Sequence, residues 1–260
     1  MRPGAHHTEH MARTAPTASP ADDGWHRYTT AEDPAGGVDD VVYGADLPGE
    51  SELRLLGPVE GRRIVDLGCG VGHNAIRLAG HGAKGRHRSP SPDHLAVARQ
   101  RADEAEVRVE FHQADLADLA FLRSDSIDAA YSAMTLAEVD DLARVFRQVH
   151  RILKPESPVV FTLPHPAFTM LDLSSDDPLL RLARGYEDDT PVSWRGAGGA
   201  VTDHPRTIST VFTALHRTNF RVDHILEPTA PPKGKHSSWF TEAMRHVPAA
   251  VLFRARKQGN

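Results

Sequence analysis

The residues with the clearest chemical meaning are three closely spaced glycines, Gly68, Gly70 and Gly72, in the stretch VDLGCGVG (residues 65–72). A short β-branched run leads into these glycines, and residues with helical spacing follow them. Glycine permits a tight turn and lets a ligand approach the backbone closely. The pattern therefore predicts a strand, a ligand-binding loop and a helix.

Two features of this loop separate the possible ligands. The dinucleotide fingerprint G-x-G-x-x-G would place its third glycine at position 73, which is His73, whereas the spacing here is G-x-G-x-G. Asp66, directly before the loop, would repel a pyrophosphate and favour a cationic ligand. S-adenosylmethionine carries an ammonium and a sulfonium but no phosphate, so the chemistry of the loop favours this cofactor.

The stretch VDLGCGVG is similar to the first motif of class I S-adenosylmethionine-dependent methyltransferases. The resemblance continues in QADLADL (113–119), DSIDAAYSAMTLAEVDD (125–141) and VFRQVHRILKPESPVVFTLPHP (145–166), the last typical of the small-molecule branch. It extends from about Trp25 to Lys257. The cofactor-binding residues that it implies are Tyr43, Asp66, Gly68, Cys69, Gly70, Gly72, Asn74, Ser89, Asp115, Leu116 and Ser132.

Several of these residues have a second interpretation. The resemblance implies that Asp115, with Leu116 beside it, contacts the adenine amino group, although an acid in a loop is often only solvated. Asn74 either binds the cofactor or caps a helix, and Tyr43 either folds over the cofactor or packs in the core. Cys69 between two glycines is expected to be a small filler rather than a nucleophile.

The segment GRHRSP (residues 85–90) departs from the family pattern. In the family, the second strand is apolar and ends in an acid that binds the ribose hydroxyls, and here that position falls on Ser89. Adjacent basic side chains are poor material for a buried strand. Exchanging the carboxylate for a hydroxyl would cost about 1–3 kcal/mol of binding. The segment is a local frameshift, a real change that weakens the site, or an altered site in which Arg86 or Arg88 meets an anion.

Alternating strand and helix patterns predict the fold class. Strands are expected at residues 63–67, 107–113, 127–132, 158–163, 221–227 and 249–256, and helices at 73–79, 92–104, 140–153 and 207–218. This order indicates a doubly wound α/β fold. The resemblance implies a Rossmann-like sheet of seven strands, mostly parallel with an antiparallel last strand and with helices on both faces.

Composition limits the functional classes. The chain of 260 residues has a net charge of −5, which argues against a nucleic-acid partner, and no stretch is apolar enough to cross a membrane. Residues 1–24 are expected to be a disordered tail, and its histidines His6, His7 and His10 offer no fixed metal site. Residues 25–260 form the expected methyltransferase domain. With Cys69 as its only cysteine, the chain is expected in a reducing cytoplasm.

An insertion at about residues 165–205, rich in Pro, Gly, Ser and Asp, is expected to form a lid. The candidates for a general base are His165 after the fifth strand, His204 at the end of the insertion and Glu138 after the fourth strand. Each of the three also has a structural interpretation. Trp194, Trp239 and Phe240 either line an apolar acceptor pocket or anchor these loops.

Three functions compete at this point. The first is methyl transfer from S-adenosylmethionine to a small-molecule acceptor. The second is a non-catalytic or repurposed protein of the same fold with a weakened cofactor site, which the segment 85–90 supports. The third, a nicotinamide-dependent oxidoreductase, is disfavoured by the glycine spacing and by Asp66.

Overall fold

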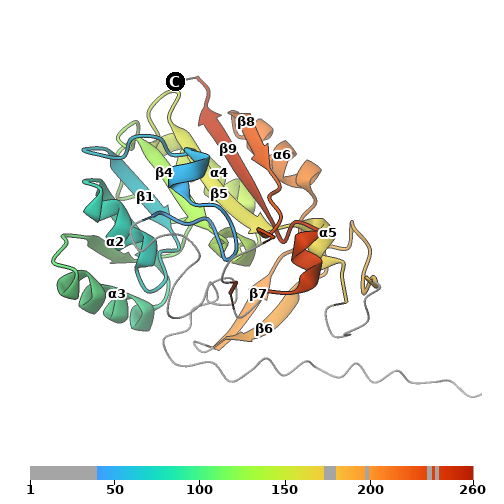
Figure 1. Ribbon diagram of the computed structural model, residues 1–260. Helices are drawn as coiled ribbons and strands as arrows, with labels where there is room; N and C mark the ends of the chain where they lie inside the picture. The colour runs from blue at the N-terminus through green and yellow to red at the C-terminus, as the bar shows by residue number, and fades with distance from the viewer. Residues whose placement is uncertain (1–39, 173–179, 197–198, 233–235, 238–239, 260) are drawn as a thin grey trace, which may run out of the picture.

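The central feature of the protein is a seven-stranded sheet with the strand order β3-β2-β1-β4-β5-β9-β8 (Figure 1). The computed structural model describes residues 40–172, 180–196, 199–232, 236–237 and 240–259. The strands are β1 (Arg63–Leu67), β2 (Lys84–Ser89), β3 (Glu110–Gln113), β4 (Ala129–Ala133), β5 (Pro158–Pro164), β8 (Phe220–Leu226) and β9 (Ala250–Lys257). Because β9 runs antiparallel to β5 and β8 while β1 to β5 pair in parallel, the predicted sheet is confirmed.

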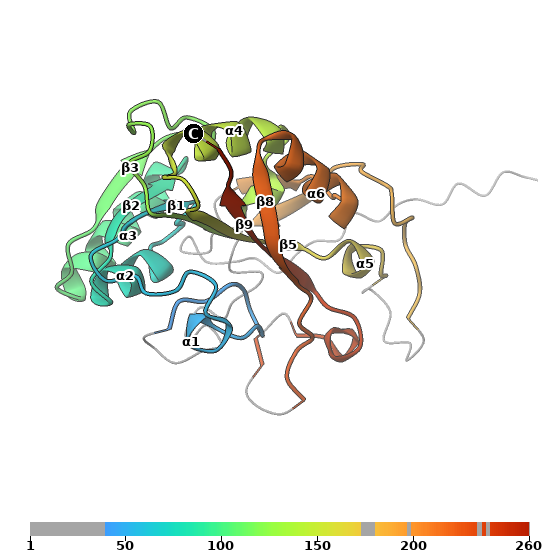
Figure 2. The same ribbon diagram turned by 90° about the horizontal axis from the view of Figure 1, so that it is seen from above.

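Helices cover both faces of this sheet. The longer ones are α2 (His73–Gly80), α3 (Pro92–Glu104), α4 (Leu142–Ile152) and α6 (Ile208–Arg217), and the short ones are α1 (Glu50–Leu53), α5 (Pro166–Thr169) and the 3-10 turns η2 (Thr135–Glu138) and η3 (Glu242–Arg245). Figure 2 shows α2 and α3 on one side of the sheet and α4 and α6 on the other. No helix in the described part of the chain has the length and apolarity that a membrane crossing requires.

The predicted elements agree with the structure apart from their ends. The strand predicted from residue 107 begins only at Glu110, because the amide of Val107 still donates to the carbonyl of Ala102 at the end of α3 (3.1 Å). Helix α4 begins at Leu142 rather than at residue 140, since the carboxylate of Asp141 caps it by accepting from the amide of Arg144 (2.8 Å). The tail of residues 1–24 and the histidines in it lie outside the described residues.

Residues 85–89 of the segment 85–90 lie in a regular strand, contrary to the expectation that the basic residues are unsuited to one. β2 pairs in parallel with both β1 and β3. Alternation along the strand places His87 and Arg88 on opposite faces, and both are buried. His87 lies beside Asp66 of β1, whereas the guanidinium of Arg88 lies 4.2 Å from the centre of the Phe121 ring and donates to the carbonyl of Asp118.

These contacts also correct the interpretation of Arg86 or Arg88 as an anion ligand in an altered site. Arg88 is held by Asp118 and Phe121, on the face of β2 opposite to Ser89. Arg86 is partly exposed and lies 3.5 Å from the carboxylate of Glu110 on β3. Both guanidinium groups therefore have partners within the protein, Arg86 on β3 and Arg88 in the loop after β3.

Gly85 leaves room for the buried imidazole of His87. A methyl group at position 85 would lie 1.9 Å from Nε2 of His87, so we expect Gly85→Ala to lower the free energy of unfolding by about 1–3 kcal/mol in urea titrations. The double variant Gly85→Ala/His87→Val should recover most of this loss. Gly80→Ala is the matched control, because a methyl group there meets nothing within 4 Å. Equal stability of the Gly85→Ala and unaltered proteins would contradict this packing.

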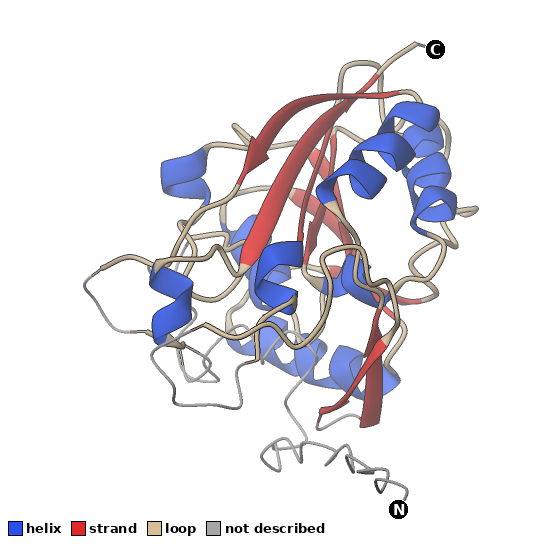
Figure 3. Cartoon of the chain, turned by 90° about the vertical axis from the view of Figure 1, so that its right-hand side faces the viewer, coloured by secondary structure: helices blue, strands red, loops and turns tan. Residues whose placement is uncertain are grey.

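The predicted insertion contains a separate hairpin of β6 (Val192–Gly196) and β7 (Gly199–Asp203), which the sequence did not predict (Figure 3). The chain that follows β7 is bonded to the turn after η2. The guanidinium of Arg206 donates to the carbonyls of His204 (2.8 Å), Asp140 (2.9 Å) and Val139. Burial lowers the pKa of Arg206. The hairpin is thus attached beside the carboxyl end of β4.

Removing this fastening is expected to loosen β7. In Arg206→Ala, three carbonyls lose a charged donor, and we expect the free energy of local opening to fall by about 1–3 kcal/mol. Hydrogen exchange of the β7 amides measures this change. Arg184→Ala is the control, since Arg184 donates to two carbonyls of its own turn, Asp188 (2.8 Å) and Thr190 (2.9 Å). Unchanged exchange in β7 of Arg206→Ala would refute the anchoring role.

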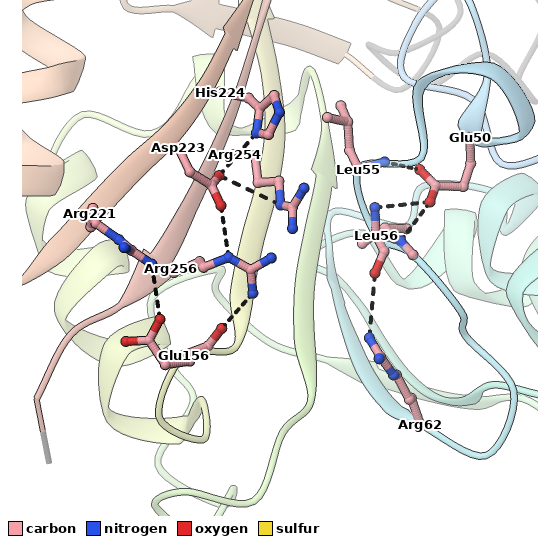
Figure 4. Close-up of polar contacts among 11 residues, drawn as sticks. Glu50, Leu55, Leu56, Arg62, Glu156, Arg221, Asp223, His224, Arg254 and Arg256 are labelled. Atoms are coloured by element: carbon pink, nitrogen blue, oxygen red, sulfur yellow. Dashed lines mark hydrogen bonds and ion pairs between the residues drawn. The ribbon is translucent and has the colours of Figure 1, made fainter.

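A charged cluster connects the last two strands of the sheet (Figure 4). Asp223 of β8 accepts from Nε of Arg256 (2.7 Å) and lies 3.3 Å from Nδ1 of the exposed His224. Arg221 donates to the carboxylate of Glu156 (3.0 Å). These partly exposed pairs contribute little to stability individually.

Candidate functional site

The glycine loop has the backbone conformation that its composition predicts. Gly68, Gly70 and Gly72 have φ angles of 93°, 51° and 90°, a region that favours glycine. A methyl group on Gly68 would lie 2.3 Å from the Thr135 side chain. The amide of Gly72 donates to the carbonyl of Cys69 (2.9 Å), which closes the turn into α2. Any larger residue at position 68 would displace the loop.

A small open pocket lies beside this loop, at the carboxyl ends of β1 and β4. It encloses about 270 Å³, including space open to solvent. Its lining residues are Asp66, Gly68, Cys69, His73, Asn74, Tyr131 and Ala133. Asp66 is only 1% exposed and contributes a carboxylate to this wall. A buried carboxylate beside the backbone of the glycine loop fits a cationic ligand, as the sequence predicted for Asp66.

The end of β2 brings two further side chains to this region. Ser89, in the position where the family has its ribose-binding acid, is buried, and its hydroxyl oxygen accepts from the amide of Ser91 (3.2 Å). That bond leaves the hydroxyl proton free to donate. His87, which sequence reasoning did not assign to the site, has Nδ1 3.2 Å from a carboxylate oxygen of Asp66. The strand alternation that places His87 opposite Asp66 was the signal for it.

The acidic loop after β3 lies where the prediction placed it. Asp115 is exposed, and its carboxylate accepts from the amide of Ala117 (2.7 Å), which leaves its second oxygen for another donor. The side chain of Leu116 is buried in the main core, so a contact between Leu116 and the cofactor would have to come from its backbone.

Ser132 on β4 has a different role from the predicted one. Its side chain is fully buried, and its hydroxyl donates to the carbonyl of Leu67 (2.7 Å). The hydroxyl thus joins β4 to the last residue of β1 just before the glycine loop. Ser132 supports the loop from beneath instead of facing a ligand.

Asn74 and Tyr43 hold the segment before α1 against the sheet. The side-chain amide of Asn74 donates to the carbonyl of Val42 (2.9 Å) and to the hydroxyl of Tyr131 (2.8 Å). Asn74 does not cap α2, so the interpretation of Asn74 as a helix cap is wrong. Asn74 lines the pocket, but its side-chain amide is already bonded to Val42 and Tyr131. Burial and the nearby Asp66 raise the pKa of Tyr131, which keeps this phenol neutral.

Tyr43 is a core aromatic in this structure, which corrects its assignment to the cofactor. It is fully buried, and its ring lies 5.7 Å from that of Tyr131. Its hydroxyl donates to Glu50. The carboxylate of Glu50 also accepts from the amides of Leu55 and Leu56, both at 2.9 Å, as Figure 4 shows. Burial and Glu50 raise the pKa of Tyr43.

The three predicted base candidates occupy different environments. Both ring nitrogens of His165 are engaged: Nδ1 accepts from the amide of Ala167 (3.0 Å), and Nε2 lies 2.6 Å from the carboxylate of Glu227. His165 therefore caps α5 and has no lone pair left for a substrate proton, which corrects its assignment as a base. His204 lies 3.5 Å from Asp140, whose side chain is 93% exposed, and Glu138 is itself exposed.

The aromatic residues proposed for an acceptor pocket are only partly described. Trp239 and the side chain of Trp194 lie outside the described part of the structure. Phe240 is partly buried and stacks on His236, with ring centres 3.9 Å apart. The loop between β8 and β9 thus contains at least one ordered aromatic stack.

Known proteins resemble this chain in sequence and in fold. The family described as "Methyltransferase domain" matches residues 65–161. A demethylmenaquinone methyltransferase of Clavibacter sepedonicus is 32% identical over 188 residues, which cover 63% of this chain and 76% of that protein. A ubiquinone biosynthesis O-methyltransferase of Alkalilimnicola ehrlichii is 37% identical over 109 residues, 42% of this chain, and the match spans only 44% of that relative.

Solved structures show the same architecture. The crystal structure of an S-adenosylmethionine dependent methyltransferase from Mesorhizobium loti superposes with a TM-score of 0.63 at 30% sequence identity. The alignment covers 78% of this chain and 94% of that protein. The likeness therefore includes nearly the whole of the solved protein.

Proposed function

Since this chain belongs to the family of S-adenosylmethionine-dependent methyltransferases, we propose that it transfers the methyl group of this cofactor to a small-molecule acceptor. The observation that carries the proposal is the buried carboxylate of Asp66 on the wall of a pocket formed by the glycine loop. A carboxylate in this position attracts the ammonium group of the cofactor. A reducing cytoplasmic location belongs to the same proposal and rests on the single cysteine, Cys69.

The residues around the pocket fit the parts of this cofactor. Asp66 would hold the ammonium group, and the backbone of the glycine loop would lie against the methionine portion. Ser89 would donate one hydrogen bond to the ribose, and Asp115 would accept from the adenine amino group. When bound, the cofactor supplies a methyl group attached to a sulfonium. The sulfur departs as a neutral thioether, which is a good leaving group. The task of the chain is therefore to align the two reactants and to exclude water.

The acceptor is proposed to be a small organic molecule that binds next to the carboxyl ends of β4 and β5. Two of the relatives named above are a ubiquinone biosynthesis O-methyltransferase and a demethylmenaquinone methyltransferase, and the net charge of −5 is unfavourable for nucleic acid. The β6–β7 hairpin, fastened beside η2 by Arg206, would close over this acceptor as a lid on the domain. The division of the chain into a tail of residues 1–24, a methyltransferase domain of residues 25–260 and a lid-like insertion at about residues 165–205 is part of this proposal.

A second function is supported by one observation, the serine at position 89. With a hydroxyl in place of the ribose-binding carboxylate, a repurposed protein of this fold would retain a weak cofactor site without turnover. The first function predicts that binding of the cofactor is accompanied by methyl transfer to some acceptor. The second predicts binding alone.

Calorimetric titration of the full chain with S-adenosylmethionine and with S-adenosylhomocysteine tests the proposal. We expect saturable binding of both at micromolar concentrations. NADH serves as the control ligand, because Asp66 and the glycine spacing disfavour its pyrophosphate. Absence of binding by both sulfur compounds would refute the proposed function, and saturable binding of NADH would favour an oxidoreductase instead.

A further inference from the structure

A further histidine–carboxylate pair, which sequence reasoning did not find, lies between the segment before α1 and the loop between β8 and β9. Nδ1 of His236 is 3.2 Å from a carboxylate oxygen of Asp46. Asp46 is only 4% exposed and also accepts from the amide (2.9 Å) and the hydroxyl (2.5 Å) of Ser237. With three donors directed at it, this buried carboxylate has a fixed orientation.

The chemistry of the pair determines where the proton of the imidazole lies. An ionised carboxylate only accepts hydrogen bonds, so the hydrogen of neutral His236 is on Nδ1 and the lone pair is on Nε2. Nε2 is buried and has no hydrogen-bond partner among the described residues. The ring plane is fixed by stacking on Phe240, at 3.9 Å and an interplanar angle of 12°. A buried, oriented lone pair without a donor is suited to accept a proton from a ligand.

The pair is linked to the wall of the cofactor pocket through the segment that carries Asp46. The segment that carries Asp46 is bonded through Val42 to Asn74 and Tyr131, and both of these line the pocket. Two residues before Asp46, a methyl group on Gly44 would lie 3.3 Å from Met134, which directly follows β4. Figure 2 shows this segment and the loop between β8 and β9 on the same side of the sheet.

The other histidine–carboxylate pairs lack one or more of these properties. His165 has both nitrogens engaged, and His204 contacts an exposed carboxylate at 3.5 Å. His87 is enclosed within the sheet, and its Nε2 would lie 1.9 Å from a methyl group placed on Gly85. Asp46–His236 shares a buried carboxylate and a partnerless Nε2 with Asp66–His87, but its imidazole belongs to the loop between β8 and β9 and not to a central strand of the sheet.

We propose that Asp46 and His236 form the general-base dyad of this enzyme and that its acceptor is methylated on a hydroxyl group. This inference rests on the proposed function. The acceptor oxygen forms a bond to the methyl carbon as the bond between that carbon and sulfur breaks, and the electron pair of the broken bond stays on sulfur. The hydroxyl proton passes to Nε2 of His236. Asp46 holds the resulting imidazolium through Nδ1–H.

The tautomer of His236 provides a test that does not depend on turnover. Histidine side chains of the full chain are labelled with ¹⁵N, S-adenosylhomocysteine is added, and the His236 signal is assigned with the variant His236→Gln. We expect the Nδ1–H tautomer in the unaltered protein and a shift toward Nε2–H in Asp46→Asn. Observation of the Nε2–H tautomer in the unaltered protein, or of a tautomer that Asp46→Asn leaves unchanged, would overturn the dyad.

Methyl transfer to a catechol, used as a hydroxyl probe, tests the role in catalysis. We expect His236→Gln to lower the rate by about 10²–10⁴-fold while the affinity for S-adenosylhomocysteine is unchanged. Among the residues that the structure describes, Asp46 contacts the ring directly and Arg245 lies across Phe240 from it.

His224→Gln is the matched control for this substitution. It removes an exposed imidazole 3.3 Å from Asp223, in the charged cluster between β8 and β9, and should leave the rate unchanged. Equal rates for His236→Gln and the unaltered protein would refute the base while leaving the proposed function intact. If the unaltered protein did not bind S-adenosylhomocysteine, the proposed function itself would be refuted.

Discussion

Replacing Ser89 with aspartate is expected to strengthen the binding of S-adenosylmethionine by about tenfold to a hundredfold. A hydrogen bond to a charged group contributes about 1.5–3 kcal/mol, and a carboxylate at the end of β2 could accept from both ribose hydroxyls, where the serine donates one bond. The backbone is already suited to this change, because β2 is a regular strand paired with β1 up to position 88 and with β3 up to position 89. Calorimetric titration of Ser89→Asp and of the unaltered protein measures the difference.

Ser91→Asp is the matched control for this experiment. Ser91 caps α3 by accepting from the amide of His94 (3.2 Å), a role that aspartate also performs. The control adds the same negative charge two residues away but at the helix terminus. An equal gain in affinity from both variants would mean that general electrostatic attraction is responsible and that Ser89 does not lie at the ribose. No gain from Ser89→Asp would show that the segment 85–90 does not limit cofactor binding.

Replacing Asp66 with asparagine is expected to have the opposite effect, a loss of affinity of about tenfold to a hundredfold. The substitution keeps the shape of the side chain but removes the negative charge from the pocket wall, where it faces the ammonium group of the ligand. The loss should be similar for S-adenosylmethionine and S-adenosylhomocysteine, because both compounds carry this ammonium group. Titrations of the two ligands at one pH and one salt concentration measure it.

Asp128→Asn is the control for the loss of charge at Asp66. Asp128 lies near the opposite end of β1, where its carboxylate accepts from the amide of Arg63 (2.8 Å) and from Lys154 (2.5 Å). We expect it to leave cofactor affinity unchanged. Thermal unfolding of both variants verifies that each is folded. Should Asp66→Asn bind both ligands as tightly as the unaltered protein, the assignment of Asp66 to the ammonium group would be wrong.

The local sequence determined the glycine loop and most of the elements around it. Gly68, Gly70 and Gly72 are needed because their backbone conformation is left-handed, a property of each residue and its neighbours. Asp66 adjoins the loop through the chain itself. Hydrophobic periodicity likewise determined the helices and the buried strands, since it depends on residues within one or two turns of each other.

The tertiary structure decided the roles of the polar side chains. The basic strand β2 forms because Asp66, Asp118 and Phe121, which lie far from it in the sequence, provide partners for His87 and Arg88. No local pattern contains these contacts. The same reason explains the reassigned residues: Ser132 and Tyr43 are occupied by groups from other elements.

The clearest case is the pair of Asp46 and His236, whose residues are 190 positions apart. Neither residue stood out in the sequence, because an acid in a loop and a histidine in a loop have no pattern to distinguish them. Burial of the carboxylate and the direction of the imidazole arise only when the loop between β8 and β9 meets the segment before α1. The chemical type of the cofactor site was thus encoded locally, whereas the candidate base depends on packing between distant segments.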